Sequence, residues 1–262
     1  MLVKKYPLNG YVEPGRIFGN VYFVGTHPAS VHLIDTGDGL MLIDTGYLDT
    51  LYMVVHNIWS LGFQLKDIKY ILLSHGHGDH VNGAKALVDM TGAKTFLGVD
   101  DLPMVRGELS YTKALYPFEP DVLLHDGDTV TLGNTTVTCI STPGHTDGTI
   151  SFFFNATDGE RTLRVGMFGG AGLNTLNRAY FERTGVPESN RDKYFASLER
   201  LKKEKVEVFI GNHVGNNDTE GRLAAVRAGN KDAFVDSEIW GEFLCKMEKQ
   251  LRDMMKEEAE NA

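Results

Sequence analysis

Metal-binding residue types are concentrated between Ser74 and His80, in the segment SHGHGDH. His75 and His77 are two residues apart, so in an extended chain both side chains point the same way and can reach one point. The two glycines of the segment carry no side-chain bulk and allow unusual backbone angles, so Asp79 and His80 can reach a second point nearby. Imidazole nitrogens and carboxylate oxygens are ligands of zinc and similar divalent ions. A polar turn with solvated histidines does not account for this concentration, and the segment predicts a metal site.

Buried strands and amphipathic helices are expected on both sides of this segment. Residues 68–73 (IKYILL) form a continuous apolar run, which is typical of a strand buried on both faces. Further strands are expected at residues 19–25, 30–35, 40–44, 94–99, 128–133, 135–141, 149–155, 162–168 and 206–211, and helices at residues 50–61, 81–91, 192–204 and 220–228. Strands followed by helices, twice along the chain, predict an α/β architecture with helices outside sheets.

The tail is expected to form one helix over residues 232–262. Apolar side chains recur there at spacings of three, four or seven residues, which produces a stripe along one face: Ala233, Trp240, Leu244, Met247, Leu251 and Met254. Two interpretations of the stripe stay open. Either it packs on the sheet layer of its own domain, or it forms a dimer contact.

Length and composition fit a single domain over residues 1–262. The 262 residues are ample for a sizeable core, and the net charge of −9 argues against attraction to nucleic-acid phosphates. No apolar run reaches the ~18 residues that suggest a membrane-spanning helix, and the first residues lack the apolar stretch of a signal peptide. The two cysteines, Cys139 and Cys245, form no CxxC motif, which fits a reducing compartment. We therefore expect a cytoplasmic monomer or homodimer without nucleic-acid or membrane partners.

Four segments together resemble the motifs of the metallo-β-lactamase superfamily. Residues 74–80 resemble its HxHxDH signature, and residues 40–46 (LMLIDTG) resemble its early strand that ends in aspartate. Residues 141–148 (STPGHTDG) and 208–217 (VFIGNHVGNN) resemble its later histidine motifs. The segments GRIFGNVYFVGT and RDKYFASLERLKKEKVEVFIGNH look most like the third, histidine-type subclass. The resemblance spans residues 19–217 and implies the four-layer αββα sandwich of this family.

The resemblance also implies a set of metal ligands. Two zinc ions are expected, with iron or manganese as alternatives, each held by three side chains: His75, His77 and His145 for the first, and Asp79, His80 and His213 for the second. Asp44 is expected to support the metal-binding loops without binding a metal itself. Four other histidines match no ligand motif and are assigned structural or surface roles: His27, His32, His56 and His125.

One segment departs from the family pattern. Many relatives carry an aspartate or cysteine ligand after the strand written here RVGMF, whereas residues 169–172 read GGAG and offer no ligating or hydroxyl side chain. The second metal would then depend on Asp79, His80 and His213, as in the histidine-type subclass. Recognition of a β-lactam carboxylate is expected to be poor, because hydroxyl residues near this position assist it in that subclass.

The chemistry that the resemblance implies is hydrolysis. Two metals roughly 3.5–4 Å apart lower the pKa of a shared water, and the metal-bound hydroxide attacks a carbonyl that one metal polarises. Asp79 is the expected catalytic residue, because it can orient the hydroxide and pass its proton to the leaving group. Ser74 and Ser141 are expected to make only local hydrogen bonds. The predicted substrate is a small molecule with a strained amide, lactone, thioester or similar ester, and β-lactamase activity is expected to be weak or absent.

Other functions are weighed against this one. The main alternatives are a true β-lactamase of the histidine-type subclass and an iron-binding redox member of the fold. Diiron reductases of the fold replace the second signature histidine with glutamate and carry a flavin domain, but His77 is present here and no extension of that size exists. Nucleases of the fold add an RNA-binding arm or a large inserted domain, and neither is found in this sequence.

The substrate-binding residues themselves stay unknown from the sequence. Loops near the metals are the candidates: Tyr47 with Leu48, and residues 103–120, 173–187 and 214–218. Three aromatic residues of the second loop either line an apolar wall or pack that loop on the core: Tyr111, Tyr116 and Phe118.

Overall fold

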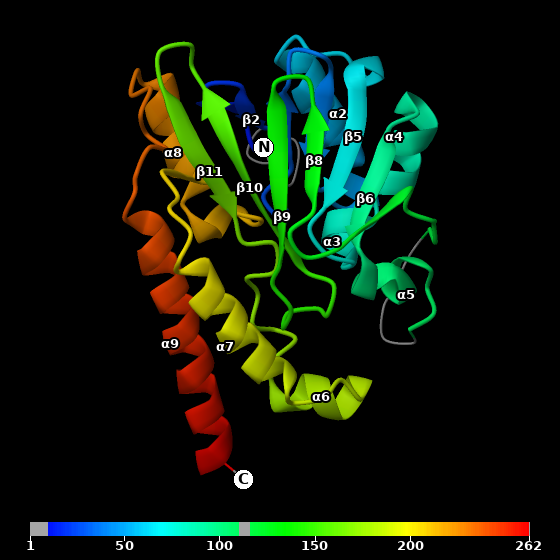
Figure 1. Ribbon diagram of the computed structural model, residues 1–262, viewed down its shortest axis with the longest axis vertical. Helices are drawn as coiled ribbons and strands as arrows, with labels where there is room; N and C mark the ends of the chain where they lie inside the picture. Colours follow the sequence, from blue (N-terminus) through cyan, green and yellow to red (C-terminus); the bar gives the residue numbers. More distant parts are fainter. Residues whose placement is uncertain (1–9, 110–115, 262) are drawn as a thin grey trace, which may run out of the picture.

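The computed structural model describes residues 10–109 and 116–261 and contains two β-sheets packed face to face (Figure 1). The first sheet has the order β1 (Gly15–Phe18), β2 (Val21–Phe23), β3 (His32–Asp35), β4 (Leu40–Ile43), β5 (Ile68–Leu73), β6 (Lys94–Gly98) and β7 (Val122–Leu124). The second has the order β12 (Val208–Phe209), β11 (Thr162–Met167), β10 (Ile150–Thr157), β9 (Thr135–Ser141) and β8 (Thr129–Leu132).

The helices lie on the outer faces and in the connections between strands (Figure 1). The α-helices of the described residues are α2 (Leu51–Ser60), α3 (Gly78–Val81), α4 (Ala84–Thr91), α5 (Leu102–Val105), α6 (Arg178–Thr184), α7 (Asn190–Leu201), α8 (Thr219–Arg227) and α9 (Ile239–Glu260). Short 3₁₀ turns are η1 (Leu48–Thr50), η2 (Leu65–Asp67), η3 (Val99–Asp101) and η4 (Val214–Asn216). None of the helices in the described ranges is long and apolar enough to cross a membrane.

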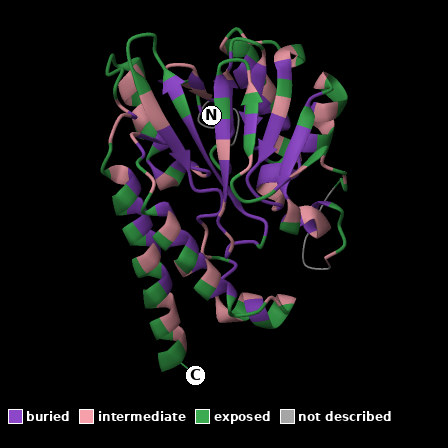
Figure 2. Ribbon diagram, viewed as in Figure 1, coloured by how far each residue is buried: buried purple, intermediate pink, exposed green. Residues whose placement is uncertain are grey.

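Three apolar clusters define four layers. The cluster between the sheets combines side chains of both, such as Met41 of β4 and Phe152 of β10. A second cluster joins the outer face of the first sheet to α2 and α4, and contains Val54 of α2. The third joins the second sheet to α7 and α9 through Leu198 and Leu244. Most strand residues are accordingly buried (Figure 2), and the four-layer αββα sandwich is confirmed.

Strand direction brings distant loops to one edge of the sandwich. Strands β4, β5 and β6 pair in parallel, so their carboxyl ends lie together. In the second sheet β11 pairs in parallel with β12, and β9 runs in the same direction because both β9 and β11 are antiparallel to β10. The two edges meet where the Ile150 amide donates to the Ser74 carbonyl at 2.8 Å. Loops that follow six strands therefore gather at this edge.

Two expected helices have different bounds in the structure. The helix expected over residues 81–91 is found as α4, which begins three residues later, at Ala84; Val81 is the last residue of the short α3. The expectation of one helix over residues 232–262 is wrong at its start, because α9 begins at Ile239. Upstream of it Val235 forms an isolated bridge with Val208, and the Asp236 carboxylate accepts the amide of Ile239.

The apolar stripe of α9 packs on its own domain. Trp240, Leu244, Met247 and Leu251 are buried in the cluster that covers the second sheet. The indole nitrogen of Trp240 also donates to the Leu201 carbonyl, at the end of α7, at 3.1 Å. Ala233, which the spacing included in the stripe, lies before the helix.

Candidate metal centre

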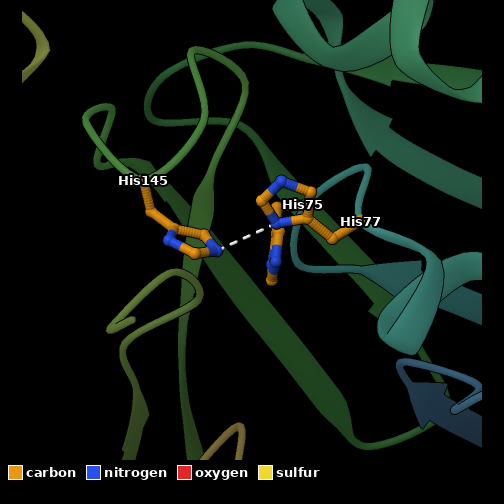
Figure 3. A group of neighbouring side chains, drawn as sticks. All are labelled: His75, His77 and His145. Atoms are coloured by element: carbon orange, nitrogen blue, oxygen red, sulfur yellow. Dashed lines mark hydrogen bonds between the residues drawn. The ribbon is translucent and has the colours of Figure 1, made fainter. Parts of the chain in front are cut away.

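Three histidines from two distant loops converge at the shared edge (Figure 3). His75 and His77 follow β5, and His145 follows β9. One ring nitrogen from each lies within 4.8 Å of the others, and the Nδ1 of His77 is 2.9 Å from the Nε2 of His145. Three imidazole nitrogens that face one point form a donor set suited to a divalent transition metal.

A second group adjoins the first. The Oδ2 atom of Asp79 lies 3.2 Å from the Nε2 of His80 and 3.6 Å from the Nε2 of His213. The rings of His75 and His80 are 4.1 Å apart between centroids, so the two groups are neighbours. The structure thus brings together all six side chains that the sequence resemblance singled out. Ligand atoms of His75, Asp79 and His80 also lie within 4.8 Å of one another.

Two ring nitrogens in these groups are buried without a hydrogen-bond partner. They are the Nε2 atoms of His75 and His80; Asp79 approaches the latter, but not with hydrogen-bonding geometry. A buried polar atom without a partner is uncommon in a native structure and calls for an explanation. Both atoms face the other ligand-type side chains, so a bound cation fits the donor set and accounts for them.

Burial keeps the first group uncharged. It lowers the pKa of His77 to about 4 and holds the pKa values of His75 and His145 well below the usual value, and the neighbouring imidazoles add to the effect for those two residues. At neutral pH these rings are therefore neutral, and each has a lone pair for a metal, as metal ligands require.

The second group carries opposite charges. Burial disfavours the charged form of His80, but the carboxylates of Asp44 and Asp79 outweigh it and raise the pKa of His80 to about 10. Burial also works against the ionised form of Asp79, yet His80 and the other histidines hold the pKa of Asp79 well below its usual range. The carboxylates of the second group therefore attract cations, and a metal ion that binds there has to displace the proton of His80.

Asp44 links three parts of this centre. Its Oδ1 accepts the amide of Ser74 at 2.7 Å, and its Oδ2 accepts the Ser74 hydroxyl at 2.8 Å and the Nδ1 of His80 at 2.7 Å. The Ser74 oxygen lies 3.0 Å from the Nδ1 of His75, which can donate to it. When Nδ1 of His75 carries the proton, its Nε2 has no hydrogen and its lone pair is free to bind a metal. Asp44 itself adopts a left-handed backbone angle, φ 63°, so the chain turns sharply to place its carboxylate here.

Backbone carbonyls orient two further histidines of the ligand groups. The Nδ1 of His145 is 2.7 Å from the Gly172 carbonyl, and the Nδ1 of His213 is 2.8 Å from the Pro28 carbonyl. In each ring this leaves Nε2 facing the ligand groups. An outer partner that fixes the tautomer and the ring angle is typical of histidines that bind metals.

The comparison with known proteins decides the family. A model of the metallo-beta-lactamase superfamily matches residues 24–213, which include Asp44 and all six converging side chains. The chain belongs to the metallo-β-lactamase superfamily.

Similarity to solved structures of this superfamily covers the whole chain. It is similar to the subclass B3 metallo-beta-lactamase of Bradyrhizobium japonicum, with a TM-score of 0.86 and 28% identity over 100% of this chain and 99% of that one. This confirms the resemblance to the third, histidine-type subclass.

Two hydrolases of the superfamily are similar in part. A probable polyketide biosynthesis zinc-dependent hydrolase from Bacillus subtilis is 30% identical over 159 residues, which are 58% of this chain and 59% of that protein. A hydroxyacylglutathione hydrolase from Cereibacter sphaeroides is 40% identical over 84 residues, which are 32% of this chain and 28% of that protein. The chain thus matches only part of the length of either hydrolase.

The glycines that depart from the superfamily pattern pack tightly behind the centre. A Cβ atom on Gly169 would lie 1.9 Å from the Ile150 carbonyl oxygen. On Gly170 it would lie 2.8 Å from the Thr149 hydroxyl and 2.9 Å from the Cβ of His145. The segment after β11 therefore leaves no room for a side chain at residues 169 and 170.

A cleft of about 620 Å³ opens onto the two ligand groups. Besides those groups it is lined by Tyr47, Asn82, Asn174, Thr175 and Tyr180. Of the expected substrate loops, Tyr47 and part of residues 173–187 do line the cleft, whereas Leu48 does not. Thr175 was not singled out from the sequence, because a lone threonine outside a motif carries no signal. Its hydroxyl lies 3.1 Å from the Nδ1 of His145.

The described residues of the other two expected substrate loops, 103–120 and 214–218, do not line this cleft. Residues 215–218 of the loop 214–218 line a different cavity of about 520 Å³ that shares no lining residue with the cleft. In the loop 103–120, Phe118 packs on the cluster beneath α2 and α4, whereas Tyr116 is 56% exposed. Tyr111 lies outside the described residues.

The remaining histidines stay outside both ligand groups. His32 is buried, with its Nε2 3.0 Å from the Gly211 carbonyl. His27 pairs with Glu220 on the surface, and His56 and His125 are exposed. These positions agree with the structural and surface roles expected for them.

Proposed function

We propose that this chain is a dinuclear metal-dependent hydrolase that cleaves a small-molecule amide, lactone, thioester or similar ester. The observation that carries the proposal is the pair of adjoining ligand groups at the base of one cleft. His75, His77 and His145 would hold the first metal, and Asp79, His80 and His213 the second. Zinc is the proposed metal, because neutral imidazoles and a carboxylate are its usual ligands.

Asp79 and Asp44 would have different roles around the metals. When bound, two such ions supply Lewis acidity and a water acidic enough to act as a nucleophile near neutral pH. Asp79 lines the cleft with its side chain 21% exposed, so its carboxylate can orient a water there and carry its proton to the leaving group. Asp44 holds His80 and the Ser74 turn in place.

The cleft lining supports an uncharged or weakly anionic substrate. Among the described lining residues there is no lysine or arginine, and the polar groups beyond the ligands are amides, phenols and one threonine hydroxyl. A β-lactam carboxylate would therefore lack a cationic side chain to bind. Each lost hydrogen bond to a charged group costs about 1.5–3 kcal/mol, or roughly ten- to hundredfold in catalytic efficiency. We propose weak or absent β-lactamase activity beside better turnover of a lactone or thioester.

β-Lactam hydrolysis is the second candidate. It is favoured by the full-length similarity to a subclass B3 enzyme. Steady-state kinetics on a penicillin, a cephalosporin and a carbapenem, beside a lactone and thioester panel, separate the two candidates. A kcat/KM above about 10⁶ M⁻¹s⁻¹ on any β-lactam, which is high for enzymes in general, would make the antibiotic the natural substrate.

Metal content tests the core of the proposal. Protein purified without chelator and supplemented with zinc should contain close to two equivalents by elemental analysis. No bound metal would overturn the proposal. Iron at similar occupancy, with oxygen consumption in place of hydrolysis, would favour the redox alternative.

The proposal also covers the location of the protein, its domain organisation and its partners. Cys139 and Cys245 are both free thiols, which supports a cytoplasmic location. The shared apolar clusters support one domain over residues 1–262. We propose small molecules as the only class of partner beyond a second copy of the chain.

A further inference from the structure

A buried carboxylate joins the two loops that supply the first ligand group. Asp101 lies at the end of η3 and is fully buried. Its Oδ2 accepts the amide of Gly76 at 2.7 Å and the hydroxyl of Thr146 at 2.7 Å, and its Oδ1 accepts the amide of Gly148 at 2.8 Å. Gly76 lies between His75 and His77, and Thr146 follows His145. The carboxylate thus connects both loops within a single side chain.

The glycines of both loops make this connection sterically feasible. A Cβ atom on Gly148 would lie 2.7 Å from the Asp101 carboxyl carbon and 2.3 Å from the Asp101 amide nitrogen. A Cβ atom on Gly76 would lie 2.8 Å from the Cβ of Met104, in the turn after Asp101. The loop at Gly148 therefore approaches Asp101 itself, and the loop at Gly76 approaches the helix that follows Asp101, more closely than a chain with side chains at these positions could. The glycines explain how the backbone amides reach one carboxylate.

The cost of burying Asp101 indicates that its position has a purpose. No lysine, arginine or histidine is among its hydrogen-bond partners in the described structure. Burial raises the pKa of Asp101 to about 6 despite its three donors. A buried carboxylate without a cationic partner is unfavourable, and a neutral side chain of similar volume would serve simple packing better.

We propose that Asp101 is a positioning residue for the first metal: its carboxylate sets the separation between the His75–His77 loop and the His145 loop, and so the ligand geometry. The inference rests on the proposed function, because it concerns the same metal. Asp101 contacts the residues next to the ligands: Gly76, between His75 and His77, and Thr146, directly after His145. If Asp101 lost its contacts with either loop, the 2.9 Å distance between His77 Nδ1 and His145 Nε2 would increase.

The test measures the zinc affinity of the first group alone. In a His213→Ala background, which breaks the second group, zinc is titrated against a chromophoric chelator. Adding Asp101→Asn keeps the shape of the side chain but replaces one acceptor oxygen with a donor. We expect a loss of about 10–100-fold in zinc affinity, as for other outer partners of metal ligands. The visible spectrum of the cobalt-loaded protein should change as well. Asp100→Asn, an exposed neighbour of the same charge, is the matched control and should leave both readouts unchanged.

A second pair of variants keeps the test decisive if Asp101→Asn does not fold. Thr146→Val removes one hydroxyl donor to Asp101 at nearly constant volume, whereas Thr146→Ser retains it. Zinc affinity should fall several-fold with valine and be restored with serine. Equal affinities for valine and serine, or an Asp101→Asn protein within about threefold of its background with an unchanged cobalt spectrum, would overturn the inference. Failure of the unsubstituted chain to bind zinc would instead overturn the proposed function.

Discussion

The Nδ1 atom of His77 lies 2.9 Å from the Nε2 atom of His145, although 68 residues separate them in the chain. Burial holds both rings neutral, and the Gly172 carbonyl fixes the proton of His145 on its other nitrogen. Each of the two facing nitrogens therefore has a lone pair available, and both can bind the same metal ion. This relationship makes the first ligand group sensitive to the loss of a single ring.

Replacing His77 with alanine should remove most of the zinc from the first site and abolish hydrolysis, because two neutral nitrogens cannot replace three. Elemental analysis should find about one equivalent of zinc fewer than in the unsubstituted protein. His125→Ala, at an exposed position, is the control and should retain full occupancy. His213→Ala should instead weaken mainly the second site. Two full equivalents in the His77→Ala protein would contradict the ligand assignment.

Replacing Asp44 with asparagine should lower zinc affinity by about 10–100-fold. The Ser74 hydroxyl and the His80 ring both donate to Oδ2, and an amide nitrogen cannot accept a hydrogen bond. Both therefore lose their acceptor if the nitrogen replaces Oδ2, and the Ser74 amide loses its acceptor if the nitrogen replaces Oδ1. Asparagine tolerates the left-handed backbone angle of this position, so the substitution tests the carboxylate and not the backbone. Competition with a chelator measures the affinity. The exposed Asp38→Asn provides the comparison, and equal affinities for both variants would contradict a supporting role for Asp44.

His32 should make the fold less stable as the pH falls. Burial lowers the pKa of His32 from 6.5 to about 4, so below pH 6.5 the unfolded chain takes up a proton that the folded chain does not. This stability is present above pH 6.5 and is lost as the pH falls towards 4. Between pH 6.5 and 5 the loss should be about 2 kcal/mol.

The measurement for His32 is a difference between two proteins. His32→Gln retains a donor for the Gly211 carbonyl but does not titrate, so its free energy of unfolding should fall about 2 kcal/mol less than that of the unsubstituted protein over this range. Urea unfolding at each pH provides the values, and His125→Gln controls for the loss of a surface histidine. Parallel pH curves for His32→Gln and the unsubstituted chain would show that His32 is not the group responsible.

Leu251→Ala should destabilise the fold by about 2–5 kcal/mol, because this side chain of α9 is fully buried against the second sheet layer. Lys249→Ala, whose side chain is 77% exposed, should stay within about 0.5 kcal/mol of the unsubstituted protein. Denaturant unfolding gives both numbers, and size-exclusion chromatography reports the particle mass. A change in mass with little loss of stability would favour the dimer contact over packing within one chain.

Local patterns were sufficient for most strands and for the concentration of metal-binding residue types at residues 74–80. Both β5 and the cluster of residues 74–80 can be recognised in the sequence, because each is a pattern formed by adjacent residues. Asp101 was missed because its partners are backbone amides and a hydroxyl in two distant loops. The carbonyls of Pro28 and Gly172 were missed because every residue has one, so only the folded chain shows which carbonyl orients a ring.

The errors at helix ends have a similar origin. Apolar spacing continues smoothly from Ala233 into α9, but tertiary pairing of Val235 with Val208 holds the chain extended before the helix. Asp236 then satisfies the amides of Glu238 and Ile239 at the helix start. The short α3 likewise ends at Val81, beside the His80 carbonyl, which accepts both the amide and the hydroxyl of Thr45. This contact with a distant segment is not visible in helical spacing.

The glycines at 169 and 170 also limit how this enzyme can evolve. Any side chain at Gly169 would meet the Ile150 backbone, and any at Gly170 would meet Thr149 and His145 itself. An aspartate or a serine introduced at Gly170 would displace His145, a residue of the centre that it was meant to complete, and one at Gly169 would displace the start of β10. The gain of a ligand at either position is therefore closed to one-step change, and a directed-evolution campaign would first have to alter the start of β10 or the loop before it.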